Sequence, residues 1–247
     1  MIVLVCATPM ELKPVLGKGQ TANAVPGQPF PARLPESLTG VPKGRRDVLA
    51  LVTGVGPVNA ALAAGRTLAG HEISGMVNIG VAGTYDEKAL PMLATAVATA
   101  ECWPDFGLAT ETGIDPKGIG LSLGRVDNVP VFDRLELDPD KAARTMRLTL
   151  PETWRRGDSV TVGAASGTPA HAQALRTRYG ACTENMEGFA LAWACTLAGI
   201  PFLEIRTVSN LVGSREPGHW KVGQAVAELA NVVAQLFSVT DMMDQKA

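Results

Sequence analysis

Continuous runs of apolar residues, each only a few residues long, recur along the chain and alternate with segments that carry helix-start signals. Runs of this kind are typical of strands that are buried on both faces of a sheet. Pro57, Pro139 and Pro169 each follow a residue that suits a helix cap, and Gly180 is a stop signal for the last of these helices. The alternation predicts an α/β fold with a mainly parallel or mixed sheet. The expected strands are residues 1–6, 48–53, 76–79, 93–100, 160–162 and 202–208.

The composition limits the classes of protein to which the chain can belong. Of its 247 residues, 46% are hydrophobic and 19% are charged, which is typical of a soluble globular protein and not of a disordered or fibrous one. The formal net charge is −2 and the basic residues are scattered, so we expect no nucleic-acid partner. No apolar stretch reaches the roughly 20 residues that a membrane helix needs, so we expect no membrane partner.

The cysteines and the first residues indicate the compartment. The four cysteines are far apart and form no C-x-x-C pair, which favours reduced thiols. The first residues, MIVLVCATPMEL, lack a basic region and a long apolar run, so no signal peptide is expected. Both features predict a cytoplasmic protein.

We expect residues 1–247 to form a single domain with an insertion, rich in proline and glycine, at about residues 25–46. Residues 103–123 are also rich in glycine and polar side chains, and we expect them to form a loop that covers the substrate. Residues 241–247 are expected to fray. The composition of the insertion favours a surface loop or an irregular hairpin, since it contains Pro26, Pro29, Pro31, Pro35 and Pro42 together with Gly27, Gly40 and Gly44.

Several common catalytic and cofactor motifs are absent or incomplete. Gly54 and Gly56 follow a strand, but Asn59 stands where a dinucleotide-binding fingerprint needs its third glycine. The sequence has no P-loop, and residues 163–167 lack the spacing of a serine nucleophile elbow. The three histidines are isolated from one another in the sequence. We therefore expect neither a metal site nor an organic cofactor.

Four short segments place polar or small residues at strand ends, where open α/β sheets bind their ligands. In this order they resemble the nucleoside phosphorylase and nucleosidase superfamily, and most closely its futalosine-hydrolysing branch. The resemblance runs from the first strand to the last helix, apart from the insertion and residues 103–123. It implies a three-layer α/β/α fold with a twisted mixed central sheet, a nucleoside substrate, no cofactor and a homo-oligomer with residues 103–106 near the shared boundary. The segments are Ala7-Thr8-Pro9-Met10-Glu11, Gly80-Val81-Ala82-Gly83-Thr84, Glu184-Asn185-Met186-Glu187-Gly188 and Arg206-Thr207-Val208-Ser209-Asn210.

The first segment holds the expected catalytic base. By the resemblance, Glu11 matches the carboxylate that activates the attacking water in the nucleosidases. Phosphorylases of the superfamily carry a phosphate-binding arginine in this region, and residues 1–28 contain none. Water is therefore the implied nucleophile. The alternative is that Glu11 is a solvated carboxylate in the first turn of a helix, where the helix dipole favours it.

The second and third segments match the sugar site of the superfamily. The resemblance places Gly80, Val81, Ala82 and Gly83 beneath the sugar and base, where a Cβ would block the ligand. It places Met186 on the sugar face, with Glu187 accepting hydrogen bonds from both ribose hydroxyls. Val81 and Asn185 depart from the adenine-specific relatives, which often have a small polar residue and a glutamate there. The alternatives are a simple strand-end turn and an acidic helix start.

Asn210 is the residue that most constrains the substrate. Adenine nucleosidases carry at this position an aspartate that protonates the leaving base, whereas an asparagine amide cannot supply a proton. The amide can instead hydrogen-bond the O6 and N7 edge of a 6-oxopurine such as hypoxanthine. Alternatively, Asn210 has a purely structural role. Arg206 and Ser209 are expected to hold this strand end together, with Ser209 at the edge of the substrate site.

The reaction implied by the resemblance is hydrolysis of the N-glycosidic bond of futalosine, through an oxocarbenium-like sugar. Because futalosine carries an aryl carboxylate, we expect a cation near its tail, with Arg215 as the first candidate and Arg125 as the second. Three other functions stay open: a methylthioadenosine/S-adenosylhomocysteine nucleosidase, a 6-oxopurine nucleoside phosphorylase and a nucleoside-binding protein without catalysis.

Overall fold

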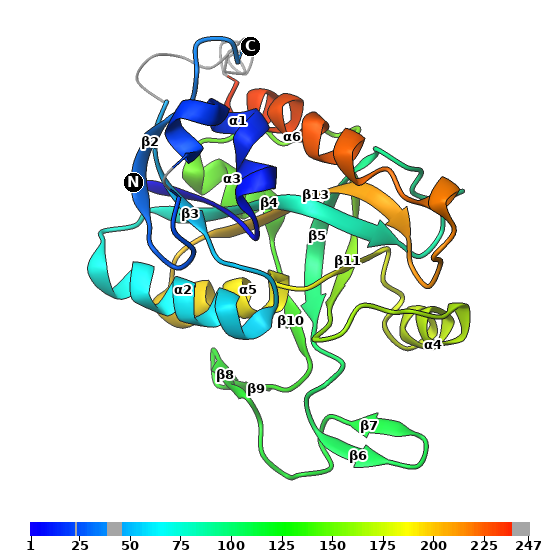
Figure 1. Ribbon diagram of the computed structural model, residues 1–247. Coiled ribbons are helices and arrows are strands. Elements are labelled where there is room, and N and C mark those ends of the chain that lie inside the picture. Colours follow the sequence, from blue (N-terminus) through cyan, green and yellow to red (C-terminus); the bar gives the residue numbers. More distant parts are fainter. Residues whose placement is uncertain (23, 39–45, 239–247) are drawn as a thin grey trace, which may run out of the picture.

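A mixed β-sheet forms the centre of the protein (Figure 1). The computed structural model describes residues 1–22, 24–38 and 46–238, and among these residues nine strands join in the sheet. The order is β10-β5-β11-β12-β4-β1-β3-β2, and β13 pairs with both β4 and β5. The strands are β1 (Ile2–Cys6), β2 (Phe30–Arg33), β3 (Asp47–Val52), β4 (Gly75–Thr84), β5 (Thr95–Cys102), β10 (Arg134–Glu136), β11 (Arg155–Thr161), β12 (Thr183–Asn185) and β13 (Phe202–Leu211).

Helices cover both faces of this sheet, which confirms the expected three-layer α/β/α fold. The helices are α1 (Pro9–Thr21), α2 (Pro57–Gly70), α3 (Pro139–Met146), α4 (Pro169–Tyr179), α5 (Gly188–Ala198) and α6 (Val222–Phe237). One layer holds α1, α3 and α6, and the opposite layer holds α2 and α5 (Figure 1). Strand β1 contributes to both cores, because Leu4 faces the first layer and Val5 faces the second.

The predicted helix starts at Pro57, Pro139 and Pro169 are confirmed as the first residues of α2, α3 and α4. The side chains of Asp138 and Thr168 accept backbone hydrogen bonds at the starts of α3 and α4. Thr8, which was not predicted as a cap, begins α1 with a capping box. Gly180 ends α4 in the left-handed conformation, with φ of 63°. No helix in the described part of the chain is long and apolar enough to cross a membrane.

The sheet also has a feature that the sequence did not predict. Because β13 pairs with β4 on one side and β5 on the other, strands β4, β13, β5, β11 and β12 form a closed ring. The register between β13 and β4 shifts between Val208 and Asn210, so that Asn210 pairs with Gly83. This bulge sets the position of Asn210 relative to the sheet.

The proline-rich insertion is more ordered than a surface loop. Its residues Phe30–Arg33 form β2, which pairs with β3 as an antiparallel edge strand. The pairing confirms the hairpin among the two expected forms, but the segment is not wholly on the surface, because Leu34 is 1% exposed and belongs to the core under α1. The apolar side chain of Leu34 explains its burial, because removing apolar surface from water is favourable and a surface loop would leave this side chain exposed. Residues 39–45 and 239–247, with Gly40, Pro42, Gly44 and the expected frayed end, lie outside the described residues.

Two small hairpins extend from the sheet on the side away from α1 and α6 (Figure 1). They are β6 (Leu108–Thr110) with β7 (Gly113–Asp115), and β8 (Gly124–Val126) with β9 (Val129–Val131). The segment from residue 103 to 123 is therefore largely a hairpin arm. Trp103 anchors its base by packing against Phe106 and Phe189, with ring centroids 5.8 and 5.7 Å apart.

Candidate nucleoside site

A cavity of about 240 Å³ brings all four predicted segments together. It lies at the carboxyl ends of β1, β4 and β13, which is the usual place for a ligand in an open α/β sheet. The predicted site residues that line it are Glu11, Val81, Ala82, Gly83, Asn185, Met186, Glu187, Ser209 and Asn210.

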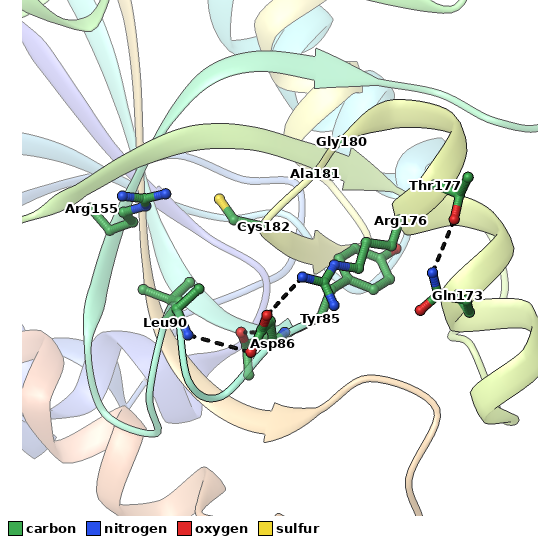
Figure 2. Close-up of a pocket in the computed structure, with 12 residues that line it drawn as sticks. Tyr85, Asp86, Leu90, Arg155, Gln173, Arg176, Thr177, Gly180, Ala181 and Cys182 are labelled. Carbon is green, nitrogen blue, oxygen red and sulfur yellow. Dashed lines mark hydrogen bonds and ion pairs between the residues drawn. The ribbon is translucent and has the colours of Figure 1, made fainter.

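A second cavity, of about 370 Å³, contains none of the predicted site residues (Figure 2). Its two arginines lie at opposite ends, and one of them, Arg176, is already paired with Asp86 at 2.7 Å. Tyr85 stands in its wall. The smaller cavity therefore remains the candidate site, because it alone of the two joins the four predicted segments.

Glu11 lies in the first turn of α1, as one of the two interpretations of the sequence expects, but it is buried at the cavity and not solvated. As the third residue of α1 it accepts hydrogen bonds from the backbone nitrogen and the hydroxyl of Thr8, both at 2.9 Å, which completes the capping box. Its other oxygen accepts a hydrogen bond from the backbone nitrogen of Val81 at 3.1 Å. The side chain is 4% exposed and lines the cavity. The helix cap thus fixes a buried carboxylate at the site, ready to accept a proton.

Glu187 is held by one backbone donor and faces one cation. The backbone nitrogen of Gly56 donates to its Oε1 at 3.0 Å, and Arg206 Nη2 lies 3.7 Å from its Oε2. Burial raises the pKa of Glu187, and the charge of Arg206 and the Gly56 hydrogen bond only partly offset this effect. The carboxylate is thus oriented toward the cavity with capacity left for further donors.

Arg206 lies behind the cavity rather than in it. Its Nε donates to Glu204 Oε1 at 2.8 Å, and the guanidinium is 2% exposed. A Cβ on Gly80 would collide with Arg206 and Glu11, so only glycine fits there. Gly80 is therefore a packing residue and does not line the cavity, which corrects its predicted contact with substrate.

Asn185 lines the cavity, but its amide is occupied by the protein. Its Nδ2 donates to Glu101 Oε1 and Ser159 Oγ, both at 2.8 Å, and its Oδ1 accepts from the backbone nitrogens of Glu187 and Gly188 at 2.9 and 2.7 Å. This amide therefore orients the start of α5 and the Glu187 backbone.

Two buried carboxyl groups meet behind Asn185. Both Glu101 and Glu204 are fully buried, and oxygens of both lie against Gly188. Burial and the neighbouring Glu204 raise the pKa of Glu101, which favours its neutral form. Among the described residues, Glu204 Oε2 has no hydrogen-bond partner.

Asn210 presents its amino group to the cavity. The Ser209 hydroxyl lies 2.8 Å from Asn210 Oδ1 and donates to it, so the carbonyl side of the amide is engaged. Among the described residues, Nδ2 has a single acceptor, the Leu211 carbonyl at 3.4 Å, which leaves one proton for a ligand. Ser209, which was expected to hold the strand end together, therefore also orients the amide of Asn210.

Several residues that line the cavity were not assigned to the site from the sequence. They are Ala7, Thr8, Met10, Val55, Ala165, Glu184 and Trp220. Glu184 stands next to the predicted Asn185, and its position at a strand end was a usable signal. Trp220 reaches the cavity through an isolated bridge with Asn210, which no sequence pattern reveals.

The predicted tail-binding arginines lie elsewhere. Arg215 is exposed and does not line the cavity, although its guanidinium lies 5.3 Å from the ring of Trp220, which does line it. Arg125 lies on β8 and donates to the backbone oxygen of Asn128. Within the described chain, no residue from 103 to 123 lines the cavity either, because the hairpin arm leads away from it.

No three His, Cys, Asp or Glu side chains of the described residues gather in a way that could hold a metal ion. The charged groups at the cavity wall are carboxylates, and no lysine or arginine is among the described residues that line it. The site thus offers hydrogen-bond acceptors, one amide donor and apolar contacts.

Comparison with known proteins assigns the chain to a family. A profile of the phosphorylase superfamily matches residues 1–241. The chain belongs to the phosphorylase superfamily. Within this superfamily, it is 36% identical to a futalosine hydrolase of Thermus thermophilus over 76% of this chain and 80% of the relative.

Solved structures of the phosphorylase superfamily share the fold. A futalosine hydrolase of Helicobacter pylori matches with a TM-score of 0.67 and 14% identity, covering 95% of each chain. A 5′-methylthioadenosine/S-adenosylhomocysteine nucleosidase of Neisseria meningitidis, in complex with methylthio-immucillin-A, matches with a TM-score of 0.69 and 20% identity, covering 95% of this chain and 96% of that one. At these identities the structural likeness concerns the fold alone.

The contact of Gly188 with the two buried carboxyl groups leads to a prediction. Gly188→Ala should lower the free energy of unfolding by about 1–3 kcal/mol, because the added methyl collides with Glu101 and Glu204 in a packed interior. Chemical denaturation measures the change. Gly223→Ala is the matched control, since this glycine also lies in the first turn of a helix but has open space around it. Equal stability of the two variants would contradict the prediction.

Proposed function

We propose that this member of the phosphorylase superfamily hydrolyses the N-glycosidic bond of futalosine and releases hypoxanthine and dehypoxanthinyl futalosine. The observation that carries the proposal is the orientation of Asn210, whose free amide proton suits the O6 and N7 acceptors of a 6-oxopurine. The 36% identity to a futalosine hydrolase supports the same substrate. The reaction would place the enzyme in menaquinone biosynthesis.

In the proposed mechanism the site stabilises an oxocarbenium-like sugar while the base leaves. Glu187 accepts hydrogen bonds from the ribose hydroxyls, and Met186 packs against the sugar. Asn210 donates to the departing base. Glu11 takes a proton from the attacking water, with its other contacts holding it in place. None of these steps calls for a cofactor.

The lining of the cavity argues for water over phosphate as the nucleophile. A phosphorylase must gather a dianion, for which arginine or lysine is the usual partner. The described residues that line the cavity include neither, and Arg206 behind it is engaged by Glu204 and faces Glu187. A 6-oxopurine nucleoside phosphorylase is therefore the weaker candidate.

Two more candidate functions fit the site less well. A methylthioadenosine/S-adenosylhomocysteine nucleosidase needs an acid near N7 of adenine, and Asn210 cannot supply a proton. A nucleoside-binding protein without catalysis would not need a buried carboxylate at the position of Glu11, which is 4% exposed and held by three hydrogen bonds.

The proposal extends to the organisation of the protein. Residues 1–247 would act as one nucleosidase domain in the cytoplasm, in keeping with four unpaired thiols, three of them buried. We also propose a homo-oligomer. Met10 and Val55 line the cavity, yet are 53% and 52% exposed, so the cavity is open toward an apolar face formed by Val55, Val58, Leu62 and Leu197. A second copy seated on this apolar face would cover the opening.

The activity is tested by incubating the protein with futalosine, inosine, aminodeoxyfutalosine and methylthioadenosine, with and without phosphate. We expect hypoxanthine from futalosine in the absence of phosphate. Glu11→Gln should lower kcat by at least about 100-fold, because glutamine preserves the capping box but cannot accept the proton. Glu72→Gln, at an exposed position, is the control. Adenine release, or strict dependence on phosphate, would contradict the proposal.

The raised pKa of Glu187 predicts the acid limb of the activity profile. The folded enzyme should lose kcat/KM as the pH falls through a value above about 4.3, the pKa of an unperturbed glutamate. Protonation removes an acceptor for the ribose hydroxyls. The raised pKa of Glu187 has the opposite effect on the free energy of unfolding, because the protein is stabilised when this carboxyl group is protonated. This stabilisation is fully present below the pKa of Glu187 in the unfolded chain, and it is lost as the pH rises through the pKa in the folded protein. An acid limb at or below pH 4.3 would contradict this assignment.

The proposed oligomer is tested by light scattering coupled to size exclusion. Leu62→Glu, at a position 69% exposed on α2, should shift the mass toward the monomer and lower kcat/KM. If a second copy covers the apolar face, the new carboxylate would lose its contact with water in the oligomer, which is unfavourable. Thr145→Glu, exposed on α3 in the opposite helix layer, should leave the mass unchanged. A wild-type monomer with full activity rules the oligomer out.

A further inference from the structure

Glu101 and Glu204 are fully buried carboxyl groups from two different strands, and one oxygen of each meets the other at the same point. Glu101 lies near the end of β5 and Glu204 lies on β13. A methyl group on Gly188 would collide with Oε1 of Glu101 and with Oε2 of Glu204, so these two oxygens lie within a few ångströms of each other. Two carboxylates this close in a protein interior repel each other unless a proton lies between them.

The two oxygens of Glu204 differ in their contacts. Oε1 accepts hydrogen bonds from Arg206 Nε at 2.8 Å and from Asn185 Nδ2 at 3.1 Å. Oε2 has no hydrogen-bond partner among the described residues, and neither has Nδ2 of Asn78, the in-register neighbour of Glu204 on β4. A buried oxygen without a donor is unfavourable, and a proton shared with Glu101 Oε1 satisfies it.

Glu101 has the capacity for such a shared proton. Its Oε1 accepts a hydrogen bond from Asn185 Nδ2 at 2.8 Å, and its Oε2 accepts one from the Thr161 hydroxyl at 2.6 Å. A carboxyl oxygen has two lone pairs, so Oε1 can bond the amide of Asn185 and the proton at the same time. Burial and the neighbouring Glu204 raise the pKa of Glu101, which acts in the same direction.

The charges around the pair also favour one proton. Among the described residues, Arg206 is the cation that bonds the pair, and it also faces Glu187 and lies close to Glu11. One positive charge thus faces the pair and two further buried carboxyl groups, and a proton on the pair lowers this imbalance. The Tyr85 hydroxyl and the Cys102 thiol near Glu101 are neutral, because burial raises the pKa of both, that of Cys102 to about 12.

Both members of the pair are connected to Glu187. The Nδ2 atom of Asn185 bonds both carboxyl groups, and its Oδ1 accepts from the backbone nitrogens of Glu187 and Gly188 at 2.9 and 2.7 Å. Arg206, which bonds Glu204, places its Nη2 at 3.7 Å from Glu187 Oε2. Repulsion between two ionised members of the pair would therefore move the side chains that orient Glu187.

We propose that one proton bridges Oε2 of Glu204 and Oε1 of Glu101. The bridged pair positions Glu187, through the amide of Asn185 on one side and the guanidinium of Arg206 on the other. Glu101 and Glu204 are positioning residues, since neither of them lines the cavity. This inference deepens the proposed function and rests on it for the activity measurement alone, because the proton bridge can be tested without substrate.

Chemical denaturation at a series of pH values compares the wild type with Glu204→Gln. The glutamine keeps an oxygen for Arg206 and Asn185, and its amide nitrogen donates to Glu101 in place of the proton. Unfolded glutamates are ionised above about pH 5, so only the folded wild type holds the extra proton there. The stabilisation that this proton gives is fully present below the unfolded pKa and is lost as the pH rises through the folded pKa.

The free energy of unfolding of the wild type should therefore fall with rising pH relative to that of Glu204→Gln, with a slope that corresponds to about one proton. Glu72→Gln, at an exposed position, should give a curve parallel to the wild type. Parallel curves for the wild type and folded Glu204→Gln would overturn the inference.

Infrared spectroscopy near neutral pH tests the wild type itself, even where a variant does not fold. A protonated carboxyl group has a carbonyl stretch that is separate from the bands of carboxylates. We expect this band in the wild type and in Glu187→Gln, which lacks the other carboxyl group with a raised pKa, and we expect it to be lost in Glu101→Gln. A wild type without the band, or a folded Glu101→Gln that keeps it, would overturn the inference.

Activity tests the positioning of Glu187. Glu204→Leu loses the bonds to Arg206 and Asn185 and should lower kcat/KM for futalosine by at least about 10-fold, whereas Glu204→Gln should recover most of this loss. Thermal melting checks that both variants are folded. Equal losses in the two folded variants overturn the positioning role. A wild type that shows the infrared band and the expected pH dependence but releases nothing from futalosine overturns the proposed function alone.

Discussion

The buried guanidinium of Arg206 is the interaction on which the candidate site depends. A cation that is 2% exposed needs close carboxylates, and it is bonded to Glu204 and lies near Glu187 and Glu11. Two of these three carboxylates also line the cavity. The positive charge of Arg206 therefore stabilises the interior and also orients Glu187, the proposed ribose acceptor, and Glu11, the proposed base. Burial and the neighbouring Glu204 raise the pKa of Glu101, which opposes a further buried negative charge beside Glu204.

Glycine makes this arrangement sterically possible. Gly80 leaves room for Arg206 and Glu11, and Gly188 leaves room for the Glu101 and Glu204 carboxyl groups. Gly83 leaves room for the Asn210 amide and for the side chain of Val212. At each position a Cβ would displace a charged or polar group of the site. The glycines of the predicted segments thus act mainly by admitting protein side chains, and not by admitting the ligand to the backbone.

The four motif segments predicted which residues line the candidate cavity. The alternating apolar runs predicted the α/β class, and the family resemblance implied the three layers. Glu11 was found through its motif, and its helix cap appears only in the structure. Two other assignments need refinement. Arg215 was chosen for its charge, but it is exposed and lies over the ring of Trp220 without lining the cavity itself. Asn185 lines the cavity as its motif predicts, yet the buried Glu101 and Ser159, both remote in sequence, occupy its amide.

The sequence by itself determined the local features of this protein: strands long enough to be buried, helices with their caps, and the chemical types of Glu11, Glu187 and Asn210. Those features depend on neighbours within a few residues, so the sequence pattern contains them. The tertiary structure alone decided the ring of strands, the bulge that pairs Asn210 with Gly83, and the pairing of Glu184 with Gly83. These depend on strand order and register, which are set by packing between segments about 100 residues apart, and no local pattern encodes them.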